Sequence, residues 1–76
     1  MATITLKEIA IALHVNRTTI DLALSRVPRV GQDAKTYLYE RNKAREAVIR
    51  YFENLSEKYQ RKLDHYAEVI AKARKL

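Results

Sequence analysis

Apolar residues near the start of the chain recur at the spacing of one helical face, at Leu6, Ile9, Ala10 and Leu13. Thr5 and Glu8 have the spacing of a capping box, in which each side chain accepts a hydrogen bond from the other residue's amide. Ile4 and Ile9 occupy the positions of a hydrophobic staple. The pattern predicts a helix that begins after Thr5.

A second helix is predicted over residues 17–26. Asn16 is a favourable N-cap, and the inner face of the helix would consist of Ile20, Ala23, Leu24 and Val27. Pro28 lacks an amide hydrogen and biases the preceding residue away from helical conformation, so we expect the helix to end there. His14 and Val15 form the turn between the two helices.

Two short segments with β-forming residues follow, at residues 29–30 and 36–39, and they flank the only glycine of the chain. This arrangement predicts a β-hairpin. Alternation places Tyr37 and Tyr39 on one face of the second strand and Leu38 on the other. Either both tyrosines are available for contact, or one of them packs on the helix that follows.

From residue 40 onward the chain favours helix, because it lacks glycine and proline and is rich in alanine, glutamate, lysine and arginine. Apolar residues recur there about 3.5 positions apart, the period of a coiled-coil seam, at Phe52, Leu55, Tyr59, Leu63, Tyr66, Ile70 and Ala73. We expect a break or bend near Asn54, and therefore a head over residues 1–53 and a C-terminal dimerisation helix over residues 54–76. The alternative is an amphipathic tail that folds back on its own head.

Charge and composition point to a polyanionic partner. The chain of 76 residues carries 15 Lys and Arg against 9 Asp and Glu, a net charge of +6. Charge alone fits a solvated basic surface equally well. Without cysteine, disulfides and finger-type zinc sites are excluded, and neither His14 nor His65 has a second histidine at i+3 or i+4, so we expect no metal and no cofactor. Neither a spanning apolar run nor a signal peptide is visible, so we expect a cytoplasmic protein with no membrane partner.

Residues 6–24 resemble a helix-turn-helix. Ala10 is small where two helices would cross, Val15 is apolar after the turn, and Ile20 is apolar in the second helix. His14 stands at the turn position that usually holds glycine because it has positive φ, a region that histidine tolerates at some strain.

Two families share this opening. Residues 5–10, 15–20 and 23–25 (TLKEIA, VNRTTI and ALS) are similar to the headpiece of Lac-repressor-type regulators, which continue directly into a third helix and a large sugar-binding domain. Residues 30–39 instead resemble the wing of MerR-like winged-helix proteins, a superfamily that includes phage excisionases and the DNA-binding domain of phage small terminase subunits. The resemblance covers residues 4–53. It implies a mainly α fold with a small β-hairpin, in which a winged helix-turn-helix head precedes a C-terminal amphipathic or coiled-coil helix.

The resemblance also implies a set of DNA contacts. The second helix would enter the major groove with its N-terminal residues toward the base edges, and the wing would follow the backbone. The candidate residues are Asn16, Arg17, Thr18, Thr19, Asp21, Leu22, Ser25, Arg26, Arg29, Lys35 and Tyr37. Arg17 suits a bidentate contact with guanine and Leu22 a contact with a thymine methyl. Asp21 would repel phosphates unless it accepts from cytosine or is held by a neighbour such as Arg17.

Arg41, Lys43 and Arg45 add charge at the start of the third helix, where they either reach phosphate or form a solvated face. The alternative for each candidate in the second helix is an ordinary exposed helical residue that contacts no DNA.

The function expected from the sequence is sequence-specific binding of double-stranded DNA by a homodimeric transcriptional regulator or a mobile-element directionality factor. Two paired tails would place two recognition helices about one DNA turn apart. The alternatives are an adaptor that marks DNA for a larger phage or plasmid assembly, as small terminase subunits do, and the DNA-binding fragment of a longer protein. An enzyme is not expected, because the sequence shows no nucleophile with a base, no paired carboxylates and no phosphate loop.

Overall fold

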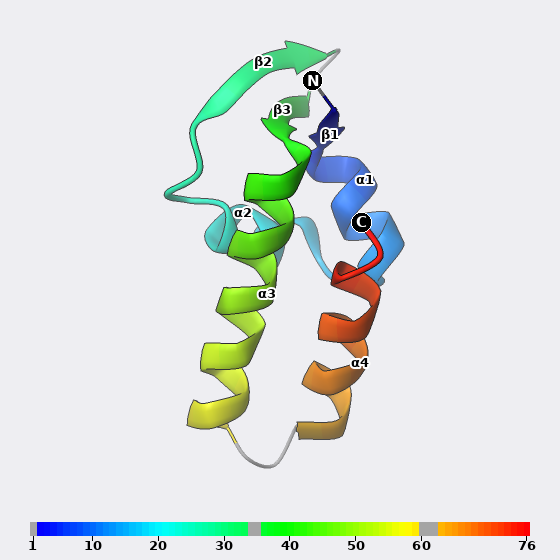
Figure 1. Ribbon diagram of the computed structural model, residues 1–76, viewed down its shortest axis with the longest axis vertical. Helices are drawn as coiled ribbons and strands as arrows, with labels where there is room; N and C mark the ends of the chain where they lie inside the picture. Colours follow the sequence, from blue (N-terminus) through cyan, green and yellow to red (C-terminus); the bar gives the residue numbers. More distant parts are fainter. Residues whose placement is uncertain (1, 34–35, 60–62) are drawn as a thin grey trace.

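The computed structural model describes residues 2–33, 36–59 and 63–76. The described elements follow in the order β1 (Thr3–Thr5), α1 (Leu6–Leu13), α2 (Arg17–Ala23), β2 (Arg29–Asp33), β3 (Thr36–Glu40), α3 (Arg41–Lys58) and α4 (Leu63–Ala73). The strands form one antiparallel sheet in the order β1-β3-β2. This sheet lies at one end of the molecule, and the long helices α3 and α4 run side by side toward the other end (Figure 1). The architecture is mainly α with a small three-stranded sheet.

The start of α1 forms as the sequence predicts. The Glu8 amide donates to the Thr5 hydroxyl at 3.0 Å, and the Thr5 amide donates to the Glu8 carboxylate at 3.4 Å, which completes the capping box. Strand β1, just before this cap, was not predicted. It pairs with β3, so that Ile4 lies opposite Tyr39 and is buried. A three-residue strand shows no alternation of its own, and its partner lies far along the chain.

The turn between α1 and α2 places His14 in the left-handed region, at φ 54° and ψ 42°, which confirms the prediction of positive φ. The His14 amide donates to the Ile11 carbonyl at 3.3 Å and the Val15 amide to the Ala10 carbonyl at 3.1 Å. These two bonds form a Schellman motif, which satisfies the last carbonyls of α1. The chain is thereby redirected into α2.

Helix α2 is shorter than predicted. It begins after Asn16, whose side chain accepts from the Thr18 amide at 2.8 Å, and it ends at Ala23 instead of Arg26. The next residues form a tight turn, in which the Val27 amide donates to the Leu24 carbonyl at 3.0 Å. The chain therefore keeps its hydrogen bonds but leaves the α-helix before the constraint imposed by Pro28 is reached.

Strands β2 and β3 confirm the two predicted strand segments, although β2 extends beyond the predicted residues 29–30 to Asp33, and we use the word wing as a label for these two strands alone. A bulge between Arg29 and Gly31 leaves Val30 out of the ladder and exposed. The two tyrosines of β3 differ, since Tyr39 is 1 % exposed and belongs to the core whereas Tyr37 is 37 % exposed. One tyrosine therefore packs inside, and the other remains at the surface.

Helix α3 runs without interruption to Lys58, so the predicted break near Asn54 is wrong. The Ser56 hydroxyl donates to the Phe52 carbonyl one turn earlier, at 3.0 Å. Ser56 is therefore bonded within a continuing helix, and the sequence NLSE does not start a new one. Among the described residues, α3 ends with Tyr59 as its C-cap, and α4 begins at Leu63.

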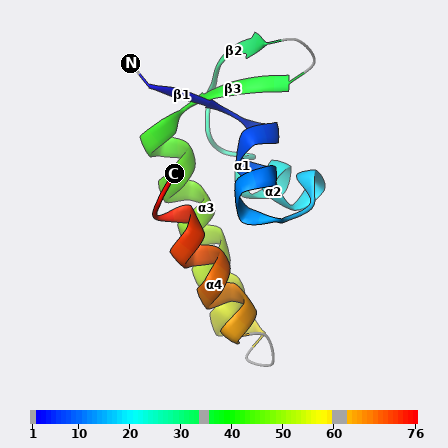
Figure 2. The same ribbon diagram turned by 90° about the vertical axis from the view of Figure 1, so that its right-hand side faces the viewer.

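Helix α4 turns back against α3 and α1 (Figure 2), which is the folded-back alternative for the tail. The ring centroids of Phe52 and Tyr66 lie 6.0 Å apart, so α3 and α4 meet through aromatic side chains. One core includes residues of the sheet and all four helices, among them Ile9, Ile20, Tyr39, Phe52 and Val69.

The residues of the expected dimer seam mostly face this core. Phe52, Tyr66 and Ala73 are buried, while Leu55 and Ile70 pack partly buried against them. Tyr59 is 48 % exposed. Leu63 starts α4, but its side chain lies outside the described part of the structure. A seam between two copies would require α4 to leave α3.

Candidate nucleic-acid interface

The first candidate surface is the side of α2 that faces away from the core. Ile20 and the C-cap Leu24 are buried and anchor the helix. Because successive helical residues turn by about 100°, the positions opposite Ile20 belong to Thr18, Leu22 and the following Ser25, which are all exposed. We call these three residues the outward face of α2.

The other predicted contacts on α2 surround this face. Asn16, Arg17, Asp21 and Arg26 are exposed, and Thr19 is partly buried. Arg17 is therefore accessible, while the tail packs on α1 and α3. The Asn16 side chain is already engaged as the N-cap of α2. An arginine, two hydroxyls and an apolar side chain can together distinguish base edges.

The wing fixes a second cation beside α2. The Arg29 guanidinium carbon lies 3.6 Å from the centroid of the Tyr37 ring, a cation–π contact. A hydrogen bond with the Tyr39 side chain raises the pKa of Arg29, and the charge of Asp21 adds to this effect. The Tyr37 ring therefore holds the face of the guanidinium, which leaves the donor groups at its edge available to a phosphate.

Asp21 is exposed on α2, and its charge contributes to raising the pKa of Arg29 in the wing. The sequence suggested Arg17 as the neighbour that would hold this acid, and the structure adds Arg29 as an electrostatic partner. Lys35, the remaining predicted contact in the wing, lies outside the described residues.

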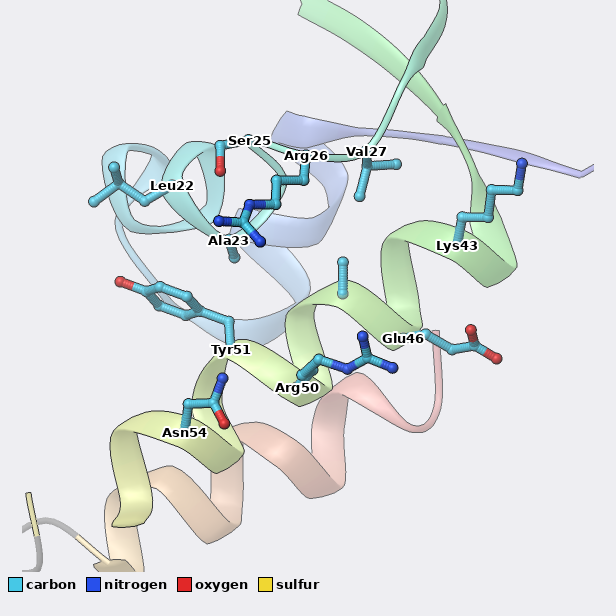
Figure 3. Close-up of a pocket in the computed structure, with 11 residues that line it drawn as sticks. Leu22, Ala23, Ser25, Arg26, Val27, Lys43, Glu46, Arg50, Tyr51 and Asn54 are labelled. Atoms are coloured by element: carbon cyan, nitrogen blue, oxygen red, sulfur yellow. The ribbon is translucent and has the colours of Figure 1, made fainter. Parts of the chain in front are cut away.

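The opposite flank of α2 borders a cleft of about 400 Å³ between the end of α2 and α3 (Figure 3). Arg26 contributes from the α2 side, and Lys43 and Arg50 contribute from α3. Of the three cations considered at the start of α3, Lys43 is exposed, whereas Arg41 and Arg45 are partly buried. Arg50 was missed by sequence analysis, although its spacing from Lys43 puts both on one face of a helix.

A second hollow, of about 370 Å³, lies where the α1–α2 turn meets α3 and α4, and it is lined in part by His14, His65 and Tyr66. The structure thus brings together two histidines that are far apart in the sequence. Tyr51 lines both this hollow and the cleft. Its ring packs edge-on against Phe52, with centroids 5.4 Å apart.

Within the described ranges, no three His, Cys, Asp or Glu side chains gather where they could hold one metal ion. The same part of the chain has no helix with the length and apolar character needed to cross a bilayer. Comparison of the chain with protein-family models, curated proteins and solved structures gives no match.

Proposed function

We propose that this chain binds double-stranded DNA in a sequence-specific manner, with α2 as the recognition helix in the major groove and the wing on a flanking backbone. The observation that carries the proposal is the position of α2. The helix is anchored by the buried Ile20, its outward face is exposed, and the wing presents Arg29 held against the Tyr37 ring. We further propose that it serves as a transcriptional regulator or as a directionality factor of a mobile element.

The chemistry of the outward face supports contact with bases. Leu22 is 59 % exposed at the centre of an otherwise polar face, where it can pack on a thymine methyl. Thr18 offers a hydroxyl to a base or a phosphate. Arg17, at the first turn of α2, has the two parallel donors that match the acceptors of guanine.

Charge supports the same partner. The net charge of +6 attracts a phosphate backbone at long range, and this attraction supplies affinity without sequence preference. Sequence preference must then come from the few side chains that reach base edges. Substitutions on α2 should therefore reduce sequence preference, whereas substitutions of distant cations should weaken binding to all duplexes alike.

The first test is selection of preferred duplexes from a random DNA pool, followed by substitution of Arg17. We expect Arg17→Ala to lose about 1–3 kcal/mol of binding free energy on the selected site and little on random DNA. Fluorescence anisotropy with both duplexes measures the two losses. Lys72→Ala is the matched control, because Lys72 is an exposed cation on α4.

Two results would refute the proposal. One is a selection from which no preferred sequence emerges. The other is an equal loss on selected and random duplexes for Arg17→Ala, which would show that Arg17 contacts phosphate alone. An equal effect of Lys72→Ala and Arg17→Ala would likewise argue against α2 as the recognition helix.

A further inference from the structure

We propose that the cleft between α2 and α3 binds a phosphate of the DNA backbone on the side of the major groove opposite the wing. The proposal rests on the DNA binding proposed above and adds a second, separate contact to it. Its cations are Arg26, Lys43 and Arg50, which come from two elements and line one cleft.

The residues of α3 reach the cleft because they share one helical face. Lys43, Ala47, Arg50 and Asn54 are spaced by four, three and four residues, and all of them line the cleft. Opposite them, Arg26 extends from the turn after α2 toward the space above α3 (Figure 3). Cations therefore lie on both walls of the cleft, and in Figure 3 the Lys43 amine points away from the Arg26 guanidinium.

The charge of the cleft favours an anion. Its described lining carries three cations and one carboxylate, Glu46, for a net charge of +2 at neutral pH. In Figure 3 the Glu46 carboxylate lies on the far side of the cleft from the Arg26 guanidinium. Hydroxyls of Ser25 and Tyr51 are available as neutral donors to phosphate oxygens.

The position of the cleft relative to α2 identifies the source of the phosphate. Leu22 and Ser25 belong to the outward face of α2, and both also line the cleft. The cleft is therefore continuous with the surface proposed to meet the bases. A phosphate bound there would belong to the same duplex that α2 reads.

The two sides of α2 border different parts of the proposed interface. Ala23 lines the cleft, and Asp21 lies about 200° from Ala23 around the helix, on the opposite flank. A major groove about 12 Å wide is bordered by two phosphate backbones. With α2 in the groove, Arg29 lies toward one backbone and the cleft toward the other.

The experiment measures how affinity for the selected duplex and for a random duplex depends on salt. The double variant Lys43→Gln, Arg50→Gln is expected to reduce the magnitude of the slope of log K against log salt by about 1, since one phosphate contact contributes about 0.9. The ratio of the two affinities should stay constant, because these residues touch no base. Glu46→Gln should strengthen binding to both duplexes.

Controls keep the result specific to the cleft. The substituted side chains are exposed, so circular dichroism and melting should match the unaltered chain. Lys72→Gln removes one charge from α4, against two in the double variant, and should change the slope by less than half as much. Duplexes with single neutral methylphosphonates should locate one backbone position at which the unaltered chain loses affinity and the double variant does not.

The outcomes separate this proposal from the previous one. An unchanged slope in the double variant, with sequence preference intact, would overturn the cleft contact alone. Failure of the chain to bind any duplex would overturn both. Capture of inorganic phosphate in the cleft, seen as shifts of the arginine side-chain resonances, with no effect of the double variant on DNA affinity, would make it a site for small anions instead.

Discussion

At the scale of single residues, His14 shows how a short connection is made at a cost. It adopts positive φ at the end of α1, where a left-handed conformation costs a residue with a side chain about 1–2 kcal/mol. Glycine avoids this strain but loses about 0.5–1 kcal/mol through greater freedom in the unfolded chain. We expect His14→Gly to raise the free energy of unfolding by about 0.5 kcal/mol in urea titration.

Two further variants at position 14 test the same explanation. Asparagine tolerates the left-handed region, so His14→Asn should leave stability nearly unchanged. A β-branched side chain tolerates it poorly, and His14→Val should lower stability. Lower stability for the glycine variant would show that the exposed His14 ring makes a contact worth more than the backbone strain.

Tyr37 is the second residue with a separable role, because its ring holds Arg29. An exposed cation–π contact contributes about 0.5–1 kcal/mol, so Tyr37→Ala should weaken DNA binding about two- to fivefold. The loss should be similar on selected and random duplexes, since the wing is proposed to contact the backbone. Tyr37→Phe keeps the ring and should keep the affinity, whereas a loss in the phenylalanine variant would point to the hydroxyl as the contacting group.

At the scale of elements, the sequence predicted those features that neighbouring residues determine, such as the starts of helices. Thr5, Glu8 and Asn16 mark the starts of α1 and α2 because caps act within one turn of the chain. Strand β1 had no such signal, since its hydrogen bonds go to β3. The sequence NLSE suggested a cap, but packing along α3 kept the helix intact.

The helix pair α3–α4 carries the prediction at this scale. The predicted spacing of apolar residues along the tail is correct. Spacing alone, however, does not distinguish packing against a second copy from packing against another helix of the same chain. Since Tyr66 packs on Phe52 within the chain, Tyr66→Ala should lower the free energy of unfolding by about 3 kcal/mol. Urea titration at several protein concentrations measures this loss, and the midpoint should not depend on concentration.

The matched control is Tyr59→Ala, which removes the exposed tyrosine of the same period and should change stability by less than about 0.5 kcal/mol. A midpoint that rises with protein concentration would contradict the prediction, because it would show that folding is coupled to pairing of two copies.

At the scale of the whole molecule, the candidate site combines features that the sequence could and could not predict. The exposed residues of α2 followed from helical period once Ile20 was taken as the inward position. The cleft could not be predicted in this way, because the position of Arg26 relative to Arg50 depends on the angle between α2 and α3. That angle is set by core packing among distant residues.

Tyr51 lines both the cleft and the hollow that is also lined by His14 and His65. The two spaces share one aromatic wall. Replacement of Tyr51 would therefore alter the lining of the proposed phosphate cleft and of the hollow beside the two histidines at the same time.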